Sequence, residues 1–449
     1  MIQLPDSVKY LIGELNKAGY EAYAVGGCVR DTLLGREPED WDLTTNATPE
    51  QVKDVFRGGG TYTIDTGIEH GTVTVMRDGE GFEVTTYRVD GRYEDARHPK
   101  DVRFATSLKE DLQRRDFTIN AMAYNEEDGL VDEFGGLADL ERGVIRCVGN
   151  PAERFGEDAL RMLRAVRFAA QLGFAIDPET RAAISQQAKN LELISAERIQ
   201  TELVKLLVSP HPDAMRDVYE TGMADVFLPE FSRMMETEQN SKYHCYNVGE
   251  HTLHCLEYAA PEKVLRLALL FHDVAKPDCV QKDEDGMDHF RGHPQLGAEM
   301  THQILRRLKF DNDTIARVCA LVRTHDDRPY PPTEQAVRRA IVRVGIGQYP
   351  DLFAVKRADI LAQSDYLKKE KLEYVDEYEA MYERILAQGD CLSRADLAVK
   401  GADLIEAGMQ PGPELGRVLD AMLEEVVDDP TLNSKEILLS RYREGCYMS

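Results

Sequence analysis

The chain has 449 residues, of which 43% are hydrophobic and 30% are charged, and its formal net charge is −26. This length predicts about two to four domains, and the acidic balance argues against a broad basic surface for nucleic acid, although a local RNA-binding groove stays possible. No apolar run approaches the roughly 18 residues that span a membrane, the N-terminus lacks a signal-peptide pattern, and the cysteines include no CxxC pair, so we expect a cytoplasmic protein with reduced thiols.

The first 145 residues predict a mixture of helices and strands, and the rest of the chain is helical in pattern. Residues 8–20 have apolar side chains at helical spacing, and residues 21–27 read as a strand ending in a glycine turn. Two β-rich runs within 71–89 are joined through Asp78-Gly79-Glu80-Gly81, which is typical of a hairpin. We expect later helices at 157–174, 178–194 and 196–208, a long loop at 281–294, and a proline-rich turn at 328–335 that begins another helix.

Asp40 and Asp42 flank Trp41 near the N-terminus. On a strand, residues i and i+2 point to one face, so both carboxylates would face a common site while Trp41 packs beneath them. Two carboxylates that lie this close repel each other, and a divalent cation relieves the repulsion. The alternative is a solvated acidic edge, which is what many such triplets are.

The residues before this pair favour a phosphate site. Gly26-Gly27 predicts a tight turn after a strand, and the run 28–34 begins a helix whose backbone N–H groups can hold phosphates. Arg30 adds a cation there, and Asp31 either holds Arg30 or caps the helix. A phosphate site beside a metal-binding pair predicts nucleotide transfer from a triphosphate with two Mg²⁺ ions. Glu83 is the best candidate for a third carboxylate, although an ordinary strand glutamate is nearly as plausible.

The strings GGCVRD and EDWDLTTNATPEQV together resemble nucleotidyltransferases of the polymerase β superfamily. More narrowly, they are similar to the class II tRNA nucleotidyltransferase and bacterial poly(A) polymerase family. The resemblance implies an α+β N-terminal domain of the polymerase-β-like type, with a mixed sheet and helices, followed by all-α neck, HD and tail regions. It also implies Mg²⁺ at Asp40 and Asp42.

The string QRRDFTINAMAY at 113–124 resembles the second motif of that family. Arg114 and Arg115 would offer guanidinium groups to the triphosphate. Asp116 and Asn120 suit recognition of a sugar hydroxyl. The alternative is a basic turn that leads into a buried helix.

Asp158 and Arg161 lie in EDALRMLRAVRF, at 157–168, with the i, i+3 spacing of one helix face. Arg161 can donate to the ring nitrogen of cytosine or adenine while Asp158 accepts from the exocyclic amine; uracil and guanine do not match both groups. The alternative is an intrahelical salt bridge, but the match to the base-selecting helix of the family favours base selection. Arg164 and Arg167 would hold the triphosphate or the RNA backbone, or simply coat the helix.

Several further segments resemble the family. Residues 134–151, with Asp139, resemble its linking segment, and 195–207 resembles the helix that braces the base-selecting helix, with Ser195 to Glu197 as its cap. The pattern TGIEHGTVTV at 66–75 follows the CCA-adding branch, and the charged stretch 87–104 resembles a flexible loop of enzymes that add the final A. We therefore expect addition of C, C and A to tRNA from CTP and ATP, while A-only addition stays open.

The later half contains the pattern H…HD…D, formed by His251, His272-Asp273 and Asp359, with His293 and His325 as plausible additions. Imidazoles and carboxylates from several helices could hold one or two divalent transition metals that activate water. The pattern resembles HD-domain phosphohydrolases over about residues 240–365, which implies hydrolysis of phosphate ends such as a 2′,3′-cyclic phosphate. The region could instead be a scaffold that contacts tRNA.

Residues 397–433 resemble the C-terminal tail of bacterial CCA-adding enzymes, with Pro413 in the first turn of a helix. The expected domains are therefore a catalytic head (1–145), a base-selecting and tRNA-binding neck (146–235), an HD domain (236–370) and a helical tail (371–449). Two rival interpretations are an HD phosphohydrolase whose N-terminal half only binds RNA, and a poly(A) polymerase. We expect tRNA, CTP and ATP as partners, and neither a membrane nor a protein partner.

Overall fold

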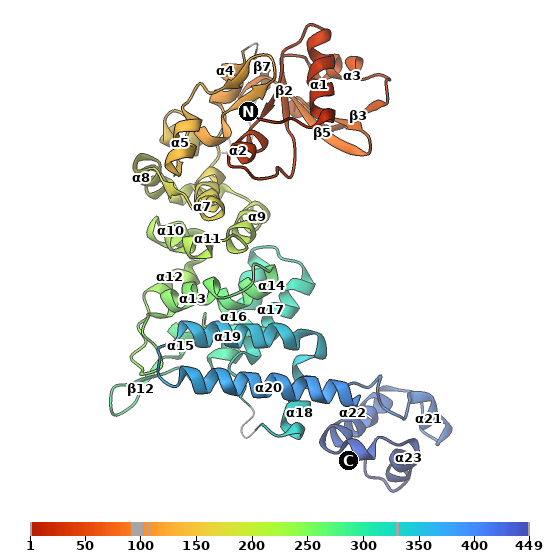
Figure 1. The fold of residues 1–449 in the computed structure, drawn as a ribbon. Coiled ribbons are helices and arrows are strands. Elements are labelled where there is room, and N and C mark those ends of the chain that lie inside the picture. The colour runs from red at the N-terminus through yellow and green to blue at the C-terminus, as the bar shows by residue number, and fades with distance from the viewer. Residues whose placement is uncertain (1, 91–101, 106, 329–331, 448–449) are drawn as a thin grey trace. The chain divides into compact units, whose positions relative to one another are not determined.

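The computed structural model describes residues 2–90, 102–105, 107–328 and 332–447. The chain divides into two compact units, Met1–Pro229 and Glu230–Ser449. The first unit begins with a mixed sheet and continues as helices, and the second unit is almost wholly helical (Figure 1). The predicted order of α+β followed by all-α is therefore confirmed. None of the helices in the described part of the chain is long and apolar enough to cross a membrane.

The first unit is built on a seven-stranded sheet of order β3-β4-β5-β2-β1-β8-β9. Only the pair β2 and β5 is parallel, and the other neighbours are antiparallel. All four residues of β1 are buried, as expected for a central strand. The strands are β1 (Ala22–Val25), β2 (Leu43–Thr45), β3 (Thr61–Gly67), β4 (Thr72–Arg77), β5 (Glu80–Thr86), β8 (Ala123–Asn125) and β9 (Gly129–Val131).

The predicted hairpin is formed by β4 and β5. Its two-residue turn is Asp78-Gly79, with φ of 52° and 86°, and positive φ at both positions is what a type I′ turn requires. The turn therefore uses fewer residues than the four expected. Short strands β6 (Arg88–Asp90) and β7 (Val102–Phe104) pair outside the main sheet. The expected loop at 87–104 has these strands at its ends, and its residues 91–101 lie outside the described residues.

Helices α1 and α3 pack together against strands of the sheet (Figure 1). The apolar residues at 8–20 form the buried face of α1, as predicted, and Thr48 and Gln51 form a capping box at the start of α3. The helices of this part are α1 (Asp6–Lys17), α2 (Gly27–Leu33), α3 (Pro49–Val55), α4 (Leu108–Gln113) and α5 (Gly136–Arg142), with 3₁₀ turns at Ile68–His70 and Thr118–Asn120.

The helix expected at 157–174 is interrupted at its start. Asp158 has extended backbone angles, φ −144° and ψ 103°, so α6 ends at Glu157 and α7 begins at Leu160. The Asp158 carboxylate accepts the Leu160 N–H at 3.1 Å, a local bond that competes with helix formation. The helices here are α6 (Pro151–Glu157), α7 (Leu160–Leu172), α8 (Pro178–Gln187), α9 (Ala196–Leu207), α10 (Met215–Glu220), α11 (Ala224–Phe227) and α12 (Pro229–Met235); 3₁₀ turns lie at Ala188–Leu193 and Pro212–Ala214, and β10 (Val144–Ile145) pairs with β11 (Ala175–Ile176).

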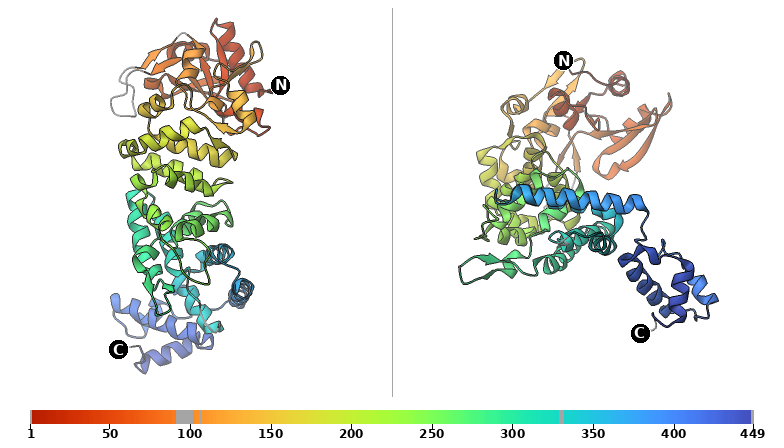
Figure 2. Two further views of the ribbon diagram at one scale, coloured as in Figure 1. Left: turned by 90° about the vertical axis from the view of Figure 1, so that its left-hand side faces the viewer. Right: turned by 60° about the horizontal axis from the view of Figure 1, so that its bottom comes forward.

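In the second unit, the long helix α20 runs beside α19 (Figure 2). The expected loop at 281–294 contains a small ribbon of β12 (Gln281–Lys282) and β13 (Asp288–His289). Pro413 occupies the first turn of α22, as predicted. The helices are α13 (Val248–Glu257), α14 (Lys263–Phe271), α15 (Lys276–Cys279), α16 (His293–Arg307), α17 (Asn312–Thr324), α18 (Glu334–Val344), α19 (Tyr349–Ala362), α20 (Lys368–Gln388), α21 (Gly401–Glu406), α22 (Pro413–Asp428) and α23 (Lys435–Arg443), with 3₁₀ turns at Ile346–Gln348 and Pro430–Leu432.

Candidate functional site

A cavity of about 650 Å³ in the first unit collects most of the residues of the first motif. Its wall is formed by α2, the segment that leads into β2, α7 and the end of α9. Asp40 and Asp42 line it together with Gly27, Arg30 and Arg167. The carboxylate pair and part of the expected phosphate site therefore share one cavity.

Asp40 and Asp42 do not lie on a strand, because β2 begins at Leu43. Both residues are exposed in the extended segment before it, and Trp41 is only half-buried. The Asp42 carbonyl accepts the Val25 N–H at 3.0 Å, so this residue is fixed to the end of β1. The sequence placed Asp40 and Asp42 on the strand, but the strand begins after them. Alternation of side chains along the sequence does not show where hydrogen bonding to the neighbouring strand begins.

Burial, Glu83 and Asp40 all contribute to a raised pKa at Asp42, at this end of the sheet. Desolvation by the surrounding protein is the largest cause of a raised pKa at Asp42, and Glu83 on β5 and Asp40 raise it further, while Arg115 lowers it. The position of Glu83 agrees with its expected role as a third carboxylate. Repulsion of this kind is relieved by a bound divalent cation, so the residues fit the Mg²⁺ that the sequence implied.

Gly26 allows Arg115 to approach the turn closely. Its φ is +84°, and a Cβ at this position would lie 2.7 Å from Nη1 of Arg115. Only glycine satisfies both conditions without strain. Nε of Arg115 is buried and donates no hydrogen bond to the described residues. Arg114 donates to the buried carboxylate of Asp111 at 2.9 and 2.8 Å, and Nη2 of Arg115 lies 3.7 Å from the same carboxylate, so Asp111 holds Arg114 more closely than Arg115.

Arg30, Asn120 and Asp116 form a continuous hydrogen-bond chain. Nη1 of Arg30 donates to Oδ1 of Asn120 at 2.7 Å, and Nδ2 of Asn120 donates to Asp116 at 3.1 Å. Arg30 also donates two hydrogen bonds to Asp31, at 2.9 and 2.8 Å. Of the two roles suggested for Asp31, this agrees with holding Arg30. Because Asp116 and Asn120 are buried and satisfied by protein groups, their visible role is to position arginines, and contact with a sugar stays a prediction.

Arg164 and Arg167 on α7 are also held by carboxylates. Arg164 makes two bonds to Oδ2 of Asp116, at 2.9 and 2.6 Å, and Arg167 donates to the buried Glu202 on α9. Burial favours the neutral form of Asp116, but Arg164 outweighs burial and holds the pKa of this carboxyl well below its usual range. Glu202 was missed in the sequence, because a carboxylate at helical spacing usually faces solvent.

Asp158 and Arg161 do not share a helix face, because Asp158 precedes α7. Asp158 accepts from Arg198 of α9 at 2.7 Å, whereas Arg161 donates to Glu157 at 2.6 Å and to the Arg114 carbonyl at 3.0 Å. The expected i, i+3 geometry is therefore wrong. Both side chains nevertheless lie where α6 meets α7, and Arg198 and Glu157 hold them.

A cluster of histidines occupies the second unit. His251 and Cys255 come from α13, His272 and Asp273 follow α14, and Asp359 comes from α19. Nε2 of His251 lies 3.0 Å from Oδ1 of Asp359 and 3.4 Å from Nε2 of His272. One donor atom from each of four residues lies within 4.8 Å of all the others, and the four are His251, Cys255, His272 and Asp359. The structure thus brings together the predicted H…HD…D residues and adds Cys255, which the sequence presented only as a buried thiol.

Asp273 connects this group with a second one. Its Oδ2 lies 3.2 Å from Nε2 of His272, and its Oδ1 lies 3.3 Å from Nε2 of His293. His293 and His325 are 3.2 Å apart through their Nε2 atoms. The second group therefore consists of Asp273, His293 and His325, and both suggested additions lie at the cluster.

The charges of the cluster fit divalent cations. Burial disfavours protonated His251, but Cys255 and Asp359 outweigh burial and raise its pKa to about 10. Burial, with His272 and His293, lowers the pKa of His325 to about 3. Oδ2 of Asp273 is buried and accepts no hydrogen bond from the described residues, although the Lys276 ammonium is 2.6 Å away. The ammonium pairs with this oxygen, so what favours a transition metal is the convergence of imidazole, thiol and carboxylate donors in the cluster.

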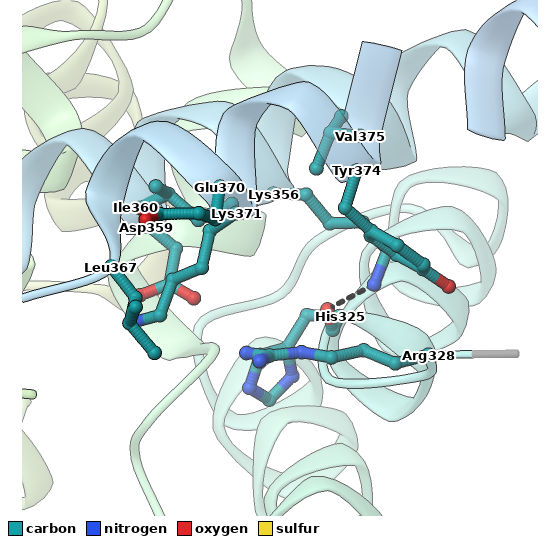
Figure 3. A pocket seen from close by; sticks show the side chains of 10 residues that line it. All are labelled: His325, Arg328, Lys356, Asp359, Ile360, Leu367, Glu370, Lys371, Tyr374 and Val375. Carbon is teal, nitrogen blue, oxygen red and sulfur yellow. Dashed lines mark hydrogen bonds between the residues drawn. The ribbon is translucent and has the colours of Figure 1, made fainter. Parts of the chain in front are cut away.

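The cluster is reached from a pocket of about 300 Å³ beside α19 and α20 (Figure 3). His325 and Asp359 lie on its wall with Arg328, Lys371 and the ring of Tyr374. Lys356 donates to the His325 carbonyl at 2.6 Å, and burial lowers the pKa of this amine to about 8. A small anionic molecule could therefore approach the cluster between cationic side chains.

Family models match three parts of the chain. Residues 22–146 match the Poly A polymerase head domain, residues 173–235 match a probable RNA and SrmB-binding site of polymerase A, and residues 293–441 match a putative tRNA nucleotidyltransferase domain 2. The third match runs through the domain boundary expected at 370/371.

Whole proteins are similar over nearly the full chain. A CCA-adding enzyme of Limosilactobacillus fermentum is 37% identical, over 96% of this chain and 94% of the relative. A crystal structure of the Bacillus stearothermophilus CCA-adding enzyme in complex with CTP is 32% identical, covers 100% of both chains and has a TM-score of 0.73. A Thermotoga maritima CCA-adding enzyme complexed with tRNA shares the fold, with a TM-score of 0.61, 22% identity, and coverage of 98% of this chain and 95% of that one.

Proposed function

This chain belongs to the family of CCA-adding tRNA nucleotidyltransferases, and we propose that it adds C, C and A to the 3′ end of tRNA from CTP and ATP without a nucleic-acid template. The observation that carries the proposal is the cavity that Asp40 and Asp42 share with a network of arginines. We assign the four expected domains accordingly: head (1–145), base-selecting neck (146–235), HD domain (236–370) and tail (371–449).

Asp40 and Asp42, supported by Glu83, would hold Mg²⁺. The metal, when bound, lowers the pKa of the attacking 3′-hydroxyl and neutralises charge on the leaving pyrophosphate. Gly26 and Gly27 leave room for the triphosphate. Arg30 and Arg115 bind its oxygens, and Arg30 is oriented for this by Asp31 and Asn120.

Asp158 and Arg161 select the base. Arg198 holds Asp158 and Glu157 holds Arg161 through hydrogen bonds, so both side chains would be positioned before the base binds. Arg164 and Arg167 extend the cationic wall, and Asp116 and Glu202 hold their side chains in place. We expect them to contact the triphosphate or the RNA backbone. Asp116 and Asn120 remain candidates for contact with the sugar.

The test is incorporation of labelled CTP and ATP into a tRNA that lacks its 3′-terminal CCA. We expect C, C and A to be added and the reaction then to stop. Repeated addition of A alone would replace the proposal with a poly(A) polymerase. Addition of a single A, and only to a tRNA that already ends in CC, would restrict the activity to A addition. If no nucleotide is incorporated, the rival interpretation, in which the N-terminal half only binds RNA, would replace the proposal.

A second function, metal-dependent hydrolysis of a phosphate ester, is favoured by the histidine cluster. His251, His272, Asp273 and Asp359, together with His293 and His325, would hold one or two divalent transition metals, which, when bound, activate water for attack on phosphorus. Arg328 and Lys371 line the pocket beside the cluster and would bind the phosphate oxygens. A terminal 2′,3′-cyclic phosphate is the substrate that we expect.

Hydrolysis of a nucleoside 2′,3′-cyclic phosphate by protein loaded with Mn²⁺, Co²⁺, Ni²⁺ or Zn²⁺ tests this function. We expect activity that His272→Ala removes and Asp40→Ala leaves unchanged. Full hydrolysis by His272→Ala would refute the assignment. A cluster that binds metal but hydrolyses nothing would instead favour a scaffold that contacts tRNA.

A further inference from the structure

Cys255 lies inside the histidine cluster rather than beside it. It follows His251 by four residues on α13, so the two side chains share a helix face. Sγ of Cys255 is 3.5 Å from Nε2 of His251, and the residue is fully buried. Sγ therefore lies among the buried donor atoms of His251, His272 and Asp359, and these four atoms are all within 4.8 Å of one another.

The distances from His251 to the other three donors are close to the edges of a tetrahedron. Metal–nitrogen bonds of about 2.05 Å and metal–sulfur bonds of about 2.3 Å predict nitrogen–nitrogen edges of about 3.4 Å and sulfur–nitrogen edges of about 3.5–3.6 Å. The His251–His272 and His251–Cys255 distances are 3.4 and 3.5 Å. The edge from His251 to Asp359 is 3.0 Å. Cys255, His272 and Asp359 therefore lie about as far from His251 as the ligands of one metal lie from each other.

The second group differs in composition. Asp273, His293 and His325 are its donors in the described part of the chain, and three donors leave a tetrahedral or larger coordination sphere open. Asp273 presents Oδ2 to the first group and Oδ1 to the second. The first group therefore has four donors and the second has three, and Asp273 lies between them.

We propose that Cys255 is a thiolate ligand that closes the first metal position together with His251, His272 and Asp359. This inference rests on metal binding by the cluster. A thiolate selects Zn²⁺, Co²⁺ or Cd²⁺ over Mg²⁺ and Mn²⁺, and its proton passes to solvent when the metal binds. The first position is then mainly structural, and the position at Asp273, His293 and His325 is the one with room for water.

Titration of the metal-stripped, full-length protein with Co²⁺ tests the proposal, because cobalt bound by a thiolate shows a sulfur-to-metal charge-transfer band in the near ultraviolet. We expect the band to grow with the first equivalent of Co²⁺ and to stop before the second equivalent is bound. Cys255→Ser should remove the band and weaken the first site by about 100-fold or more, since loss of a partner that only supports a ligand already costs about 10–100-fold. Cys319→Ser, outside the cluster, is the matched control and should keep the band.

Two equivalents of bound Co²⁺ without the band in the wild-type protein would overturn thiolate ligation while leaving metal binding intact. An unchanged band in Cys255→Ser would overturn it equally. No Co²⁺ binding at all would overturn both this inference and the proposed phosphohydrolase. If Cys255→Ser does not fold, the wild-type spectrum still decides, since it requires no variant. Nucleotide addition by Cys255→Ser reports whether the first unit is folded.

Discussion

The two candidate metal sites of this chain are built in opposite ways. Asp40 and Asp42 are exposed carboxylates at the edge of a cavity, and nearby arginines are held by buried acidic partners. His251, His272 and Asp273 are almost completely buried and lie within 3.2–3.7 Å of one another through their donor atoms. The first site offers only oxygen ligands, and the second offers nitrogen, oxygen and sulfur.

We expect this difference to separate a metal that binds together with a substrate from a metal that stays bound in the protein. Mg²⁺ keeps several waters and is usually bound by one or two carboxylates plus substrate phosphates, so an open pair beside arginines is sufficient. A transition metal that stays bound needs converging donors of the softer kind. The comparison also shows that a chain of net charge −26 has a local cationic surface, because Arg30, Arg36 and Arg167 line the cavity.

The largest expected effect is the loss of nucleotide addition when one exposed carboxylate of the first site is removed. Asp40→Ala should lower the rate of C addition by about 10³-fold or more, because charge on the triphosphate is no longer neutralised. Single-turnover incorporation of labelled CTP measures the loss, and metal content of the histidine cluster should not change. Glu39→Ala, which lines the same cavity, is the control. A variant that kept a tenth of the wild-type rate would contradict the assignment.

Chelation should affect the two units differently. After removal of all metal, Mg²⁺ alone should restore nucleotide addition, whereas a transition metal should stabilise the second unit. At a thousandfold excess over the dissociation constant, this stabilisation is about 4 kcal/mol. Hydrogen exchange of α13 and α14, compared with β1, measures it locally. Equal protection of both regions on adding Zn²⁺ would argue against a resident metal.

Loss of the proposed base-reading acceptor should change nucleotide selection at the first site and leave the histidine cluster unchanged. Asp158→Ala should reduce the preference for CTP over UTP by about 10–100-fold, the loss expected for one buried hydrogen-bonding partner. The ratio of kcat/KM for the two nucleotides is the measurement. Glu153→Ala, an exposed residue on α6, serves for comparison. An unchanged preference for CTP in Asp158→Ala would remove the base-reading proposal.

The smallest expected effect is on KM for CTP. Substitutions at Gly26 and Gly35 both strain the backbone, but only the one at Gly26 would also displace the Arg115 guanidinium. Gly26→Ala should raise KM for CTP about 10-fold, because its Cβ displaces the Arg115 guanidinium. Gly35→Ala has a similarly positive φ, 70°, with no atom within 4 Å of its added Cβ. Both variants should lose about 1 kcal/mol of stability, measured by thermal unfolding. Equal KM values would show that Arg115 does not bind the triphosphate.

Local patterns in the sequence determined which residues gather at the two sites. The glycine pair, the Asp40–Asp42 spacing and the Asp78-Gly79 turn each depend on a few neighbouring residues, and apolar periodicity identified α1 and α22. The predicted H…HD…D residues also converge as expected, since that pattern was taken from a family rather than from local geometry.

Tertiary structure decided which side chain each of these residues contacts. Asp158 leaves the helix because its carboxylate bonds to the backbone of Leu160, and it then meets Arg198, forty residues away in the chain. Glu202 and Cys255 resemble ordinary helical residues in the sequence, and only packing places one against Arg167 and the other against His251. Periodicity records which face of a helix is buried, whereas the partner on the opposing element depends on contacts between distant segments.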